Sequence, residues 1–185
     1  MKLRTNFILV FLAIGLISIT SCKDDDPVDD NVEELITTLV YTLNDGTSDV
    51  VFTFTDLDGD GGDAPVIING TLAANTTYTG SMELRNDSEN PAEDITEEIE
   101  EEDEEHQFFF AVSGANATIA YSDMDADGNP IGLSSTLTTG DASTGTMTIT
   151  LRHEPAKDGA GVSDGDISNA GGETDIEVTF DVTIQ

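Results

Sequence analysis

Short runs in which apolar and polar residues alternate constrain the fold of this chain more than any other feature. The clearest run is the last one, from Ile176 to Ile184, in which every second residue is apolar and the residues between are Glu, Thr or Asp. Successive side chains of a β-strand point to opposite faces, so this pattern predicts a strand with one buried and one solvated face. Runs 50–55, 78–85 and 146–152 show the same alternation, and runs 37–43 and 117–121 follow it less strictly.

Strands with one apolar face are typical of antiparallel sheets, because strands of parallel sheets are usually apolar on both faces. Residues 44–47, Asn-Asp-Gly-Thr, lie between two such runs and are typical of a hairpin turn. Seven to eight short strands must bury their apolar faces against a second sheet. We therefore expect residues 35–185 to form one all-β domain, a single antiparallel β-sandwich of the Ig-like kind. A closed barrel is the alternative.

The acidic segment 91–105, PAEDITEEIEEEDEE, interrupts this pattern. Pro91 and the four-residue spacing of Ile95 and Ile99 are typical of a short helix. The acids continue to the C-terminal end of the segment, against the helix dipole, and a strand follows at once, which favours an edge strand instead. The sequence leaves both interpretations open.

The first 21 residues have the layout of a secretory signal peptide, with two basic residues before an apolar run at 7–19. This run is short for a membrane span, so a transmembrane anchor is the less favoured interpretation. Cys22 is the only cysteine and cannot form an internal disulfide. Residues 19–22, ITSC, resemble the bacterial lipobox. The resemblance implies that residues 1–21 are removed and that acyl chains on Cys22 anchor the protein in the outer membrane.

Residues 22–34 are expected to be the lipidated Cys22 followed by an acidic, disordered tether. The tether begins with Lys23, Asp24, Asp25 and Asp26. A lysine followed by acids at this place resembles the export signal that sends Bacteroidetes lipoproteins to the outer face of the outer membrane. The same residues would also serve as a plain solvated tether. We expect a lipid-anchored protein that faces the cell exterior.

The charge of the chain limits its partners. It holds 38 acidic and 6 basic residues, which gives a formal net charge of −32. Too little positive charge is present to neutralise phosphates, so nucleic acid is excluded as a direct partner. The same charge disfavours direct adsorption of the domain to an anionic lipid surface.

Segments over most of the domain resemble a flavobacterial family of small exported lipoproteins. They are DLDGDGGDAP (56–65), NGTLAANTTYTG (69–80), residues 90–110, DADGNPIGL (125–133) and residues 163–185. The family has no assigned function, so the resemblance implies a location and no activity. Some members carry a label for the type 1 periplasmic-binding fold. That fold alternates helices and strands in two lobes, whereas this chain has the pattern of one β domain.

Two loops repeat the pattern Asp-x-Asp-x-Asp-Gly and are candidate calcium sites. The first holds Asp56, Asp58 and Asp60 with Asp63 nearby, and the second holds Asp123, Asp125 and Asp127 followed by Asn129. Alternate carboxylates can converge on calcium, and the glycine permits the turn of a calcium loop. Ile67 and Ser134 stand where an EF-hand has its bidentate glutamate, so calcium affinity would be weak. The alternative is an acidic surface turn.

Two histidines are candidates for a ligand rim. His153 has the parity of Leu151 and so lies at the core-facing end of its strand, and His106 has the parity of Phe108. If these strand ends meet, the histidines and a nearby acid such as Glu154 would form a metal or ligand site. The alternative is a pair of rim histidines bonded to the backbone.

Phe109 is the third candidate for the rim. In a strand its side chain would point away from those of Phe108 and Phe110. We therefore expect Phe109 either to be exposed for contact with a ligand or to be covered by another segment, such as the acidic insertion.

Residues 154–172 form a glycine-rich stretch that would cover a rim, bind a ligand or remain mobile.

Catalysis finds little support in the sequence, which has no G-x-S-x-G elbow, no second cysteine beside Cys22 and no glycine-rich phosphate loop. We expect a non-enzymatic binding or envelope-structural module for an unknown protein or extracellular ligand. A calcium-dependent or other metal or ligand capture module is the second hypothesis, and a tethered hydrolase is the third.

Overall fold

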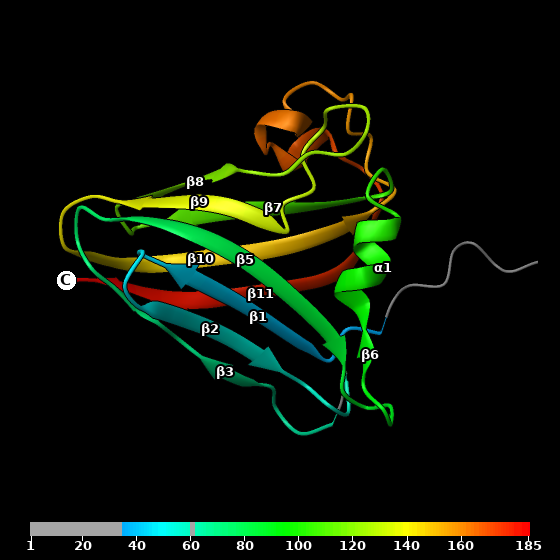
Figure 1. Ribbon diagram of the computed structural model, residues 1–185, viewed down its shortest axis with the longest axis horizontal. Helices are drawn as coiled ribbons and strands as arrows, with labels where there is room; N and C mark the ends of the chain where they lie inside the picture. The colour runs from blue at the N-terminus through cyan, green and yellow to red at the C-terminus, as the bar shows by residue number, and fades with distance from the viewer. Residues whose placement is uncertain (1–34, 60–61) are drawn as a thin grey trace, which may run out of the picture. The chain divides into compact units, whose positions relative to one another are not determined.

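Eleven strands among the described residues form two sheets (Figure 1). The computed structural model describes residues 35–59 and 62–185. The predicted signal peptide, Cys22, the Lys23–Asp26 run, the tether and Asp60 lie outside these ranges. Among the described residues, no helix has the length and apolar character needed to cross a membrane.

The larger sheet has seven strands and the smaller one four. The larger contains β1 (Thr38–Asn44), β2 (Asp49–Thr55), β3 (Val66–Ile68), β5 (Thr77–Asn86), β6 (Glu93–Asp94), β8 (Ala117–Tyr121) and β9 (Ser134–Thr139). Its order is β3-β2-β1-β5-β9-β8, and β6 pairs with β5. The smaller contains β4 (Thr71–Leu72), β7 (His106–Ser113), β10 (Ser143–His153) and β11 (Glu173–Ile184), in the order β4-β11-β10-β7. All pairs are antiparallel except β4 with β11.

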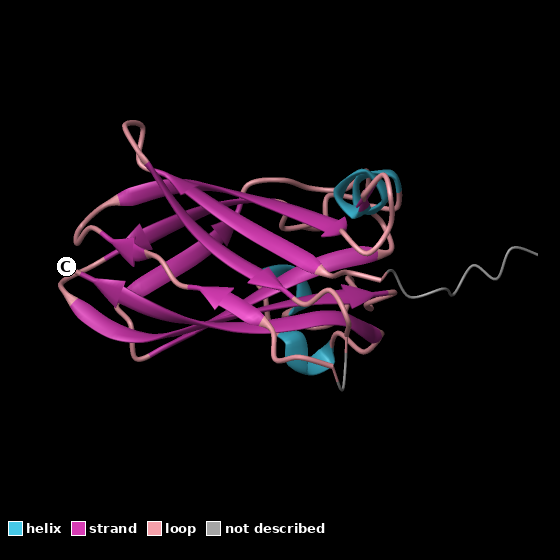
Figure 2. Cartoon of the chain, turned by 90° about the horizontal axis from the view of Figure 1, so that it is seen from below, coloured by secondary structure: helices cyan, strands magenta, loops and turns pink. Residues whose placement is uncertain are grey.

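The apolar faces of the two sheets pack against each other and form the core. The apolar residues of β11 alternate as predicted and are at most 8% exposed, as shown for Ile176, Val178, Phe180, Val182 and Ile184. Across the sandwich, the rings of Phe52 and Phe180 meet edge to face with centroids 5.5 Å apart. The predicted all-β sandwich is therefore confirmed, with two separate sheets in place of a closed barrel (Figure 2).

The predicted hairpin turn joins β1 to β2. Asn44 and Asp49 are the last paired residues, so the turn lies between them. The Asp45 carboxylate accepts hydrogen bonds from the backbone N–H groups of Thr47 and Ser48, and Gly46 has a φ of +89°. That backbone conformation is one that glycine adopts without steric cost.

Strand β3 forms one edge of the larger sheet and is apolar and exposed. Val66, Ile67 and Ile68 are 61%, 40% and 56% exposed. Their pairing with β2 satisfies only one side of the β3 backbone.

The acidic insertion contains both a strand and a helix, which resolves the open alternatives. After the two-residue strand β6, the helix α1 (Ile95–Glu101) begins, and the Asp94 side chain caps it by accepting from the Thr96 N–H. The helix therefore begins four residues after Pro91. The Thr96 hydroxyl donates to the Leu84 carbonyl and accepts from the Leu84 N–H. Together β6 and α1 thus cover the part of β5 that extends beyond its pairing with β9.

We predict that Ile99→Ala will destabilise the domain by about 2–5 kcal/mol, because Ile99 is a fully buried residue of α1 and its truncation leaves a cavity. Urea denaturation followed by circular dichroism measures the loss. Glu100→Ala, at the exposed neighbour, is the control and should change stability by no more than about 0.5 kcal/mol. Equal effects of the two substitutions would contradict a packing role for α1.

Candidate functional site

The two histidines meet at one end of the smaller sheet, as their parity predicted. His106 begins β7, His153 ends β10, and the two are directly paired in the antiparallel register. Their rings stack with centroids 4.7 Å apart and an interplanar angle of 17°. Both residues are at most 3% exposed.

The two rings differ in their polar contacts. His106 Nδ1 lies 3.2 Å from the Glu102 carbonyl oxygen, and its Nε2 lies 4.0 Å from the Asp175 Oδ2, in a pair whose side chains are both fully buried. Both ring nitrogens of His153 are also buried, but within the described part of the chain neither has a hydrogen-bond partner. His106 therefore agrees with the alternative prediction of a rim histidine bonded to the backbone. His153 has no such bond among the described residues.

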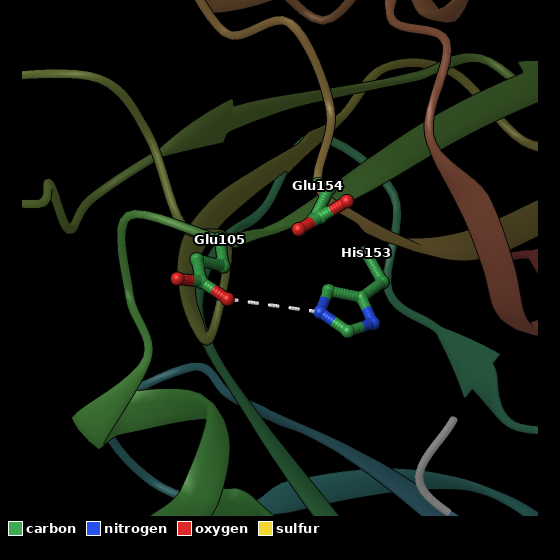
Figure 3. Close-up of side chains that lie close together, drawn as sticks. All are labelled: Glu105, His153 and Glu154. Carbon is green, nitrogen blue, oxygen red and sulfur yellow. Dashed lines mark ion pairs between the residues drawn. The ribbon is translucent and has the colours of Figure 1, made fainter. Parts of the chain in front are cut away.

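Two glutamates converge on His153. Ligand atoms of Glu105, His153 and Glu154 lie within 4.8 Å of one another, and His153 Nε2 is 3.8 Å from Glu105 Oε2 (Figure 3). The Glu154 N–H donates to the Glu105 carbonyl at 2.6 Å, which joins the two chain segments beside the site. Glu154 has a φ of +49°, an uncommon value for a residue other than glycine.

The sequence prediction included Glu154 but missed Glu105. A signal for it existed, because an antiparallel register that pairs position 106 with position 153 brings 105 opposite 154. The side chain of Glu105 is 54% exposed, so the cluster combines a buried imidazole with solvated carboxylates.

Phe109 is not an exposed aromatic, and that part of the rim prediction is wrong. Phe109 is 3% exposed and packs with Val162, Ala170 and Ile167. These partners belong to the 154–172 segment, which contains the short helices η1 (Val162–Asp164) and η2 (Ile167–Asn169). The covering segment is thus the long glycine-rich stretch, and the acidic insertion lies elsewhere, against β5.

The second Asp-rich loop uses its carboxylates to hold its own backbone. Asp123 accepts from the N–H groups of Gly132 and Ser134, at 2.8 and 2.7 Å. Asp125 Oδ1 accepts from the N–H groups of Asp127 and Asn129, at 3.1 and 2.8 Å.

The other oxygen of Asp125 binds a buried lysine. Lys157 Nζ donates to Asp125 Oδ2 at 2.9 Å and also to the Asp103 carbonyl. The side chains of Lys157 and Asp125 are 5% and 1% exposed. Burial alone would raise the pKa of Asp125, but the hydrogen bonds from Lys157 and from the Asn129 N–H outweigh it and lower that pKa. Calcium binding at this loop stays a prediction, although Lys157 already supplies the positive charge beside Asp125.

The first Asp-rich loop forms a local turn. Asp56 Oδ1 accepts from the Gly59 N–H at 3.0 Å, and Asp58 Oδ2 accepts from the Asp63 N–H at 2.9 Å. The described residues of this loop therefore place Asp63 beside Asp58, as a donor to it through its backbone. Calcium binding here also remains a prediction.

An open groove of about 440 Å³ lies at the opposite end of β7 from the histidines, lined by residues 115–118 and 138–140. None of these residues carries a charge, and most have small side chains.

Comparisons of the chain with protein-family models, with curated proteins and with solved structures find no match. The main indication of function is therefore the geometry of the Glu105–His153–Glu154 cluster.

We predict that Lys157→Met will destabilise the fold by about 3–5 kcal/mol, because it leaves the Asp125 carboxylate buried without its counter-charge. Asp125→Asn should destabilise through the same contact, and Asp127→Asn is the exposed control with little effect. Urea denaturation measures each loss. Equal losses for Asp127→Asn and Lys157→Met would contradict the ion pair as the cause.

The pH dependence of the same pair follows from the lowered pKa of Asp125. Its stabilising contribution is fully present above the ordinary value of 3.8 and is lost as pH falls through the lower folded value. The stability gap between the wild type and Asp125→Asn should therefore narrow below about pH 4.

Proposed function

We propose that this protein is a lipid-anchored, non-enzymatic binding module displayed on the outer face of a bacterial outer membrane. We further propose that it holds its ligand at the end of the sandwich where β7 begins and β10 ends. The observation that carries the binding role is His153, a buried side chain whose two ring nitrogens have no hydrogen-bond partner within residues 35–59 and 62–185.

A buried polar group without a partner costs stability, so folded proteins seldom retain one without a reason. His153 lies beside two carboxylates at a sandwich end, and loops at the ends of β-sandwiches often carry binding residues. Ligand binding would supply the bond that the described residues do not give to this imidazole. This supports a binding role at the cluster.

The surroundings support a fixed site more than a catalytic one. The buried charges of Lys157 and Asp125 bind each other and the loop backbone. The sequence also has no G-x-S-x-G elbow and no glycine-rich phosphate loop.

The membrane location rests on the signal-peptide layout, the ITSC motif and the acidic run after Cys22.

If His153 serves a ligand, its replacement by a similar-sized apolar residue should not weaken the fold. We predict that His153→Leu keeps or raises the free energy of unfolding, by up to about 1–3 kcal/mol, because it removes an unsatisfied buried group. His106→Leu is the matched control, since it removes the same ring stack but also a contact with the Glu102 carbonyl. It should be destabilising. Urea denaturation that shows equal losses for both variants would make His153 a residue of the fold.

The membrane anchor is tested at Cys22. We predict that Cys22→Ser yields an unprocessed precursor without acyl mass, because the thiol is the site of lipid attachment. Mass spectrometry and cell fractionation measure this. A variant that is processed and partitions like the wild type would overturn the anchor.

A second variant separates anchoring from display. With Lys23→Gln and with Asp24, Asp25 and Asp26 changed to Asn, the protein should still be lipidated but should resist protease added to intact cells. Unchanged digestion would reduce this run to a plain tether.

A further inference from the structure

We propose that Glu105, His153 and Glu154 bind a first-row transition-metal dication of the zinc type. The inference rests on the proposed function only in placing the ligand at this end of the sandwich, and it adds the ligand's chemical class. The acidity of the region alone would not carry it. The second observation is the His153 imidazole, which is 3% exposed and has no hydrogen-bond partner among the described residues, at the point where the two carboxylates converge.

The spacing of the donor atoms suits a small dication. Zinc binds imidazole nitrogen and carboxylate oxygen at roughly 2.0–2.2 Å, so two of its tetrahedral ligands lie about 3.3–3.5 Å apart. His153 Nε2 and Glu105 Oε2 are 3.8 Å apart, and every pair in the cluster is within 4.8 Å. Small rotations of two exposed glutamate side chains would close these gaps. Water would complete the coordination.

The nitrogen donor selects the kind of metal. Calcium prefers six to eight oxygen ligands at about 2.3–2.6 Å, and magnesium needs a rigid octahedron of oxygens. Imidazole suits zinc, copper, nickel and iron instead. The cluster is therefore chemically distinct from the Asp-rich loops, whose candidate donors are all oxygens.

The surroundings favour cations and orient the imidazole. Nine residues from Glu97 to Glu105 contain eight acids, and the C-terminal end of α1, with its partial negative charge, lies in this run. The ring of His153 is held by its stack on His106, whose Nδ1 contacts the Glu102 carbonyl. Metal-bound histidines usually donate from their second nitrogen to a protein oxygen. Among the described residues His153 has no such acceptor, so we expect modest affinity.

The test is a titration of the full-length protein, purified in detergent and freed of metal with a chelator. Calorimetry with zinc chloride should show one saturable site, and zinc should raise the melting temperature more than calcium or sodium chloride at equal ionic strength. Glu105→Gln and Glu154→Gln should each weaken zinc binding by about 10-fold or more, since each removes a ligand. His153→Leu should abolish it. Nitrogen NMR should show the His153 ring shifting with zinc while His106 shifts less.

Glu104→Gln is the matched control, because it removes the same charge from the adjacent exposed residue outside the cluster. It should change the zinc dissociation constant less than twofold. Three results would overturn the metal site: no saturable binding at millimolar zinc, equal losses for Glu104→Gln and Glu105→Gln, or a calcium effect as large as that of zinc. These three results would not change the evidence for lipidation of Cys22 or the metal-free stability of His153→Leu. Conversely, a protein without lipid on Cys22 should give the same zinc titration.

Discussion

One buried ammonium group fixes the end of the sandwich that carries Glu105, His153 and Glu154. Lys157 is the only lysine in the described part of the chain, and it joins the Asp125 carboxylate to the Asp103 carbonyl. Each partner belongs to a different loop, so three segments that are distant in sequence meet at one charge. Buried ion pairs contribute little net stability because desolvation offsets the attraction, but an unpaired charge there is costly. The pair therefore selects one loop arrangement, and Glu105 and Glu154 lie at the ends of two of these loops.

The fold could be predicted wherever one face of a strand is buried and the other solvated. In β11 that alternation gave the correct face for every residue from Ile176 to Ile184. The same logic fails for strands of two or three residues, such as β4 and β6, which are too short to show a period. It also misplaced the start of α1. Pro91 lies before the helix, which begins only after its cap at Asp94, because Glu93 and Asp94 form β6 and pair with β5.

The site was predictable as far as strand register reaches. The parity of His106 and His153 placed both inward, and the antiparallel pairing brought them together. Contacts between loops follow no such period. The cover over Phe109 and the bond from Lys157 to Asp125 both come from the 154–172 segment, whose glycines and aspartates indicate turns but do not determine where the segment packs. Both contacts depend on long-range packing, which no local sequence pattern predicts.

The apolar edge strand β3 gives the acidity of the chain a further physical meaning. An unpaired strand edge is a template for another strand, and apolar side chains make such pairing between molecules more favourable. The full sequence has a formal net charge of −32, so two copies repel before their edges can meet. This barrier is electrostatic and extends about 8 Å at physiological ionic strength, shrinking to about 3 Å at 1 M salt. The colloidal stability of the protein is thus a property of its solvent, and protonation of its carboxylates in acid removes the same barrier.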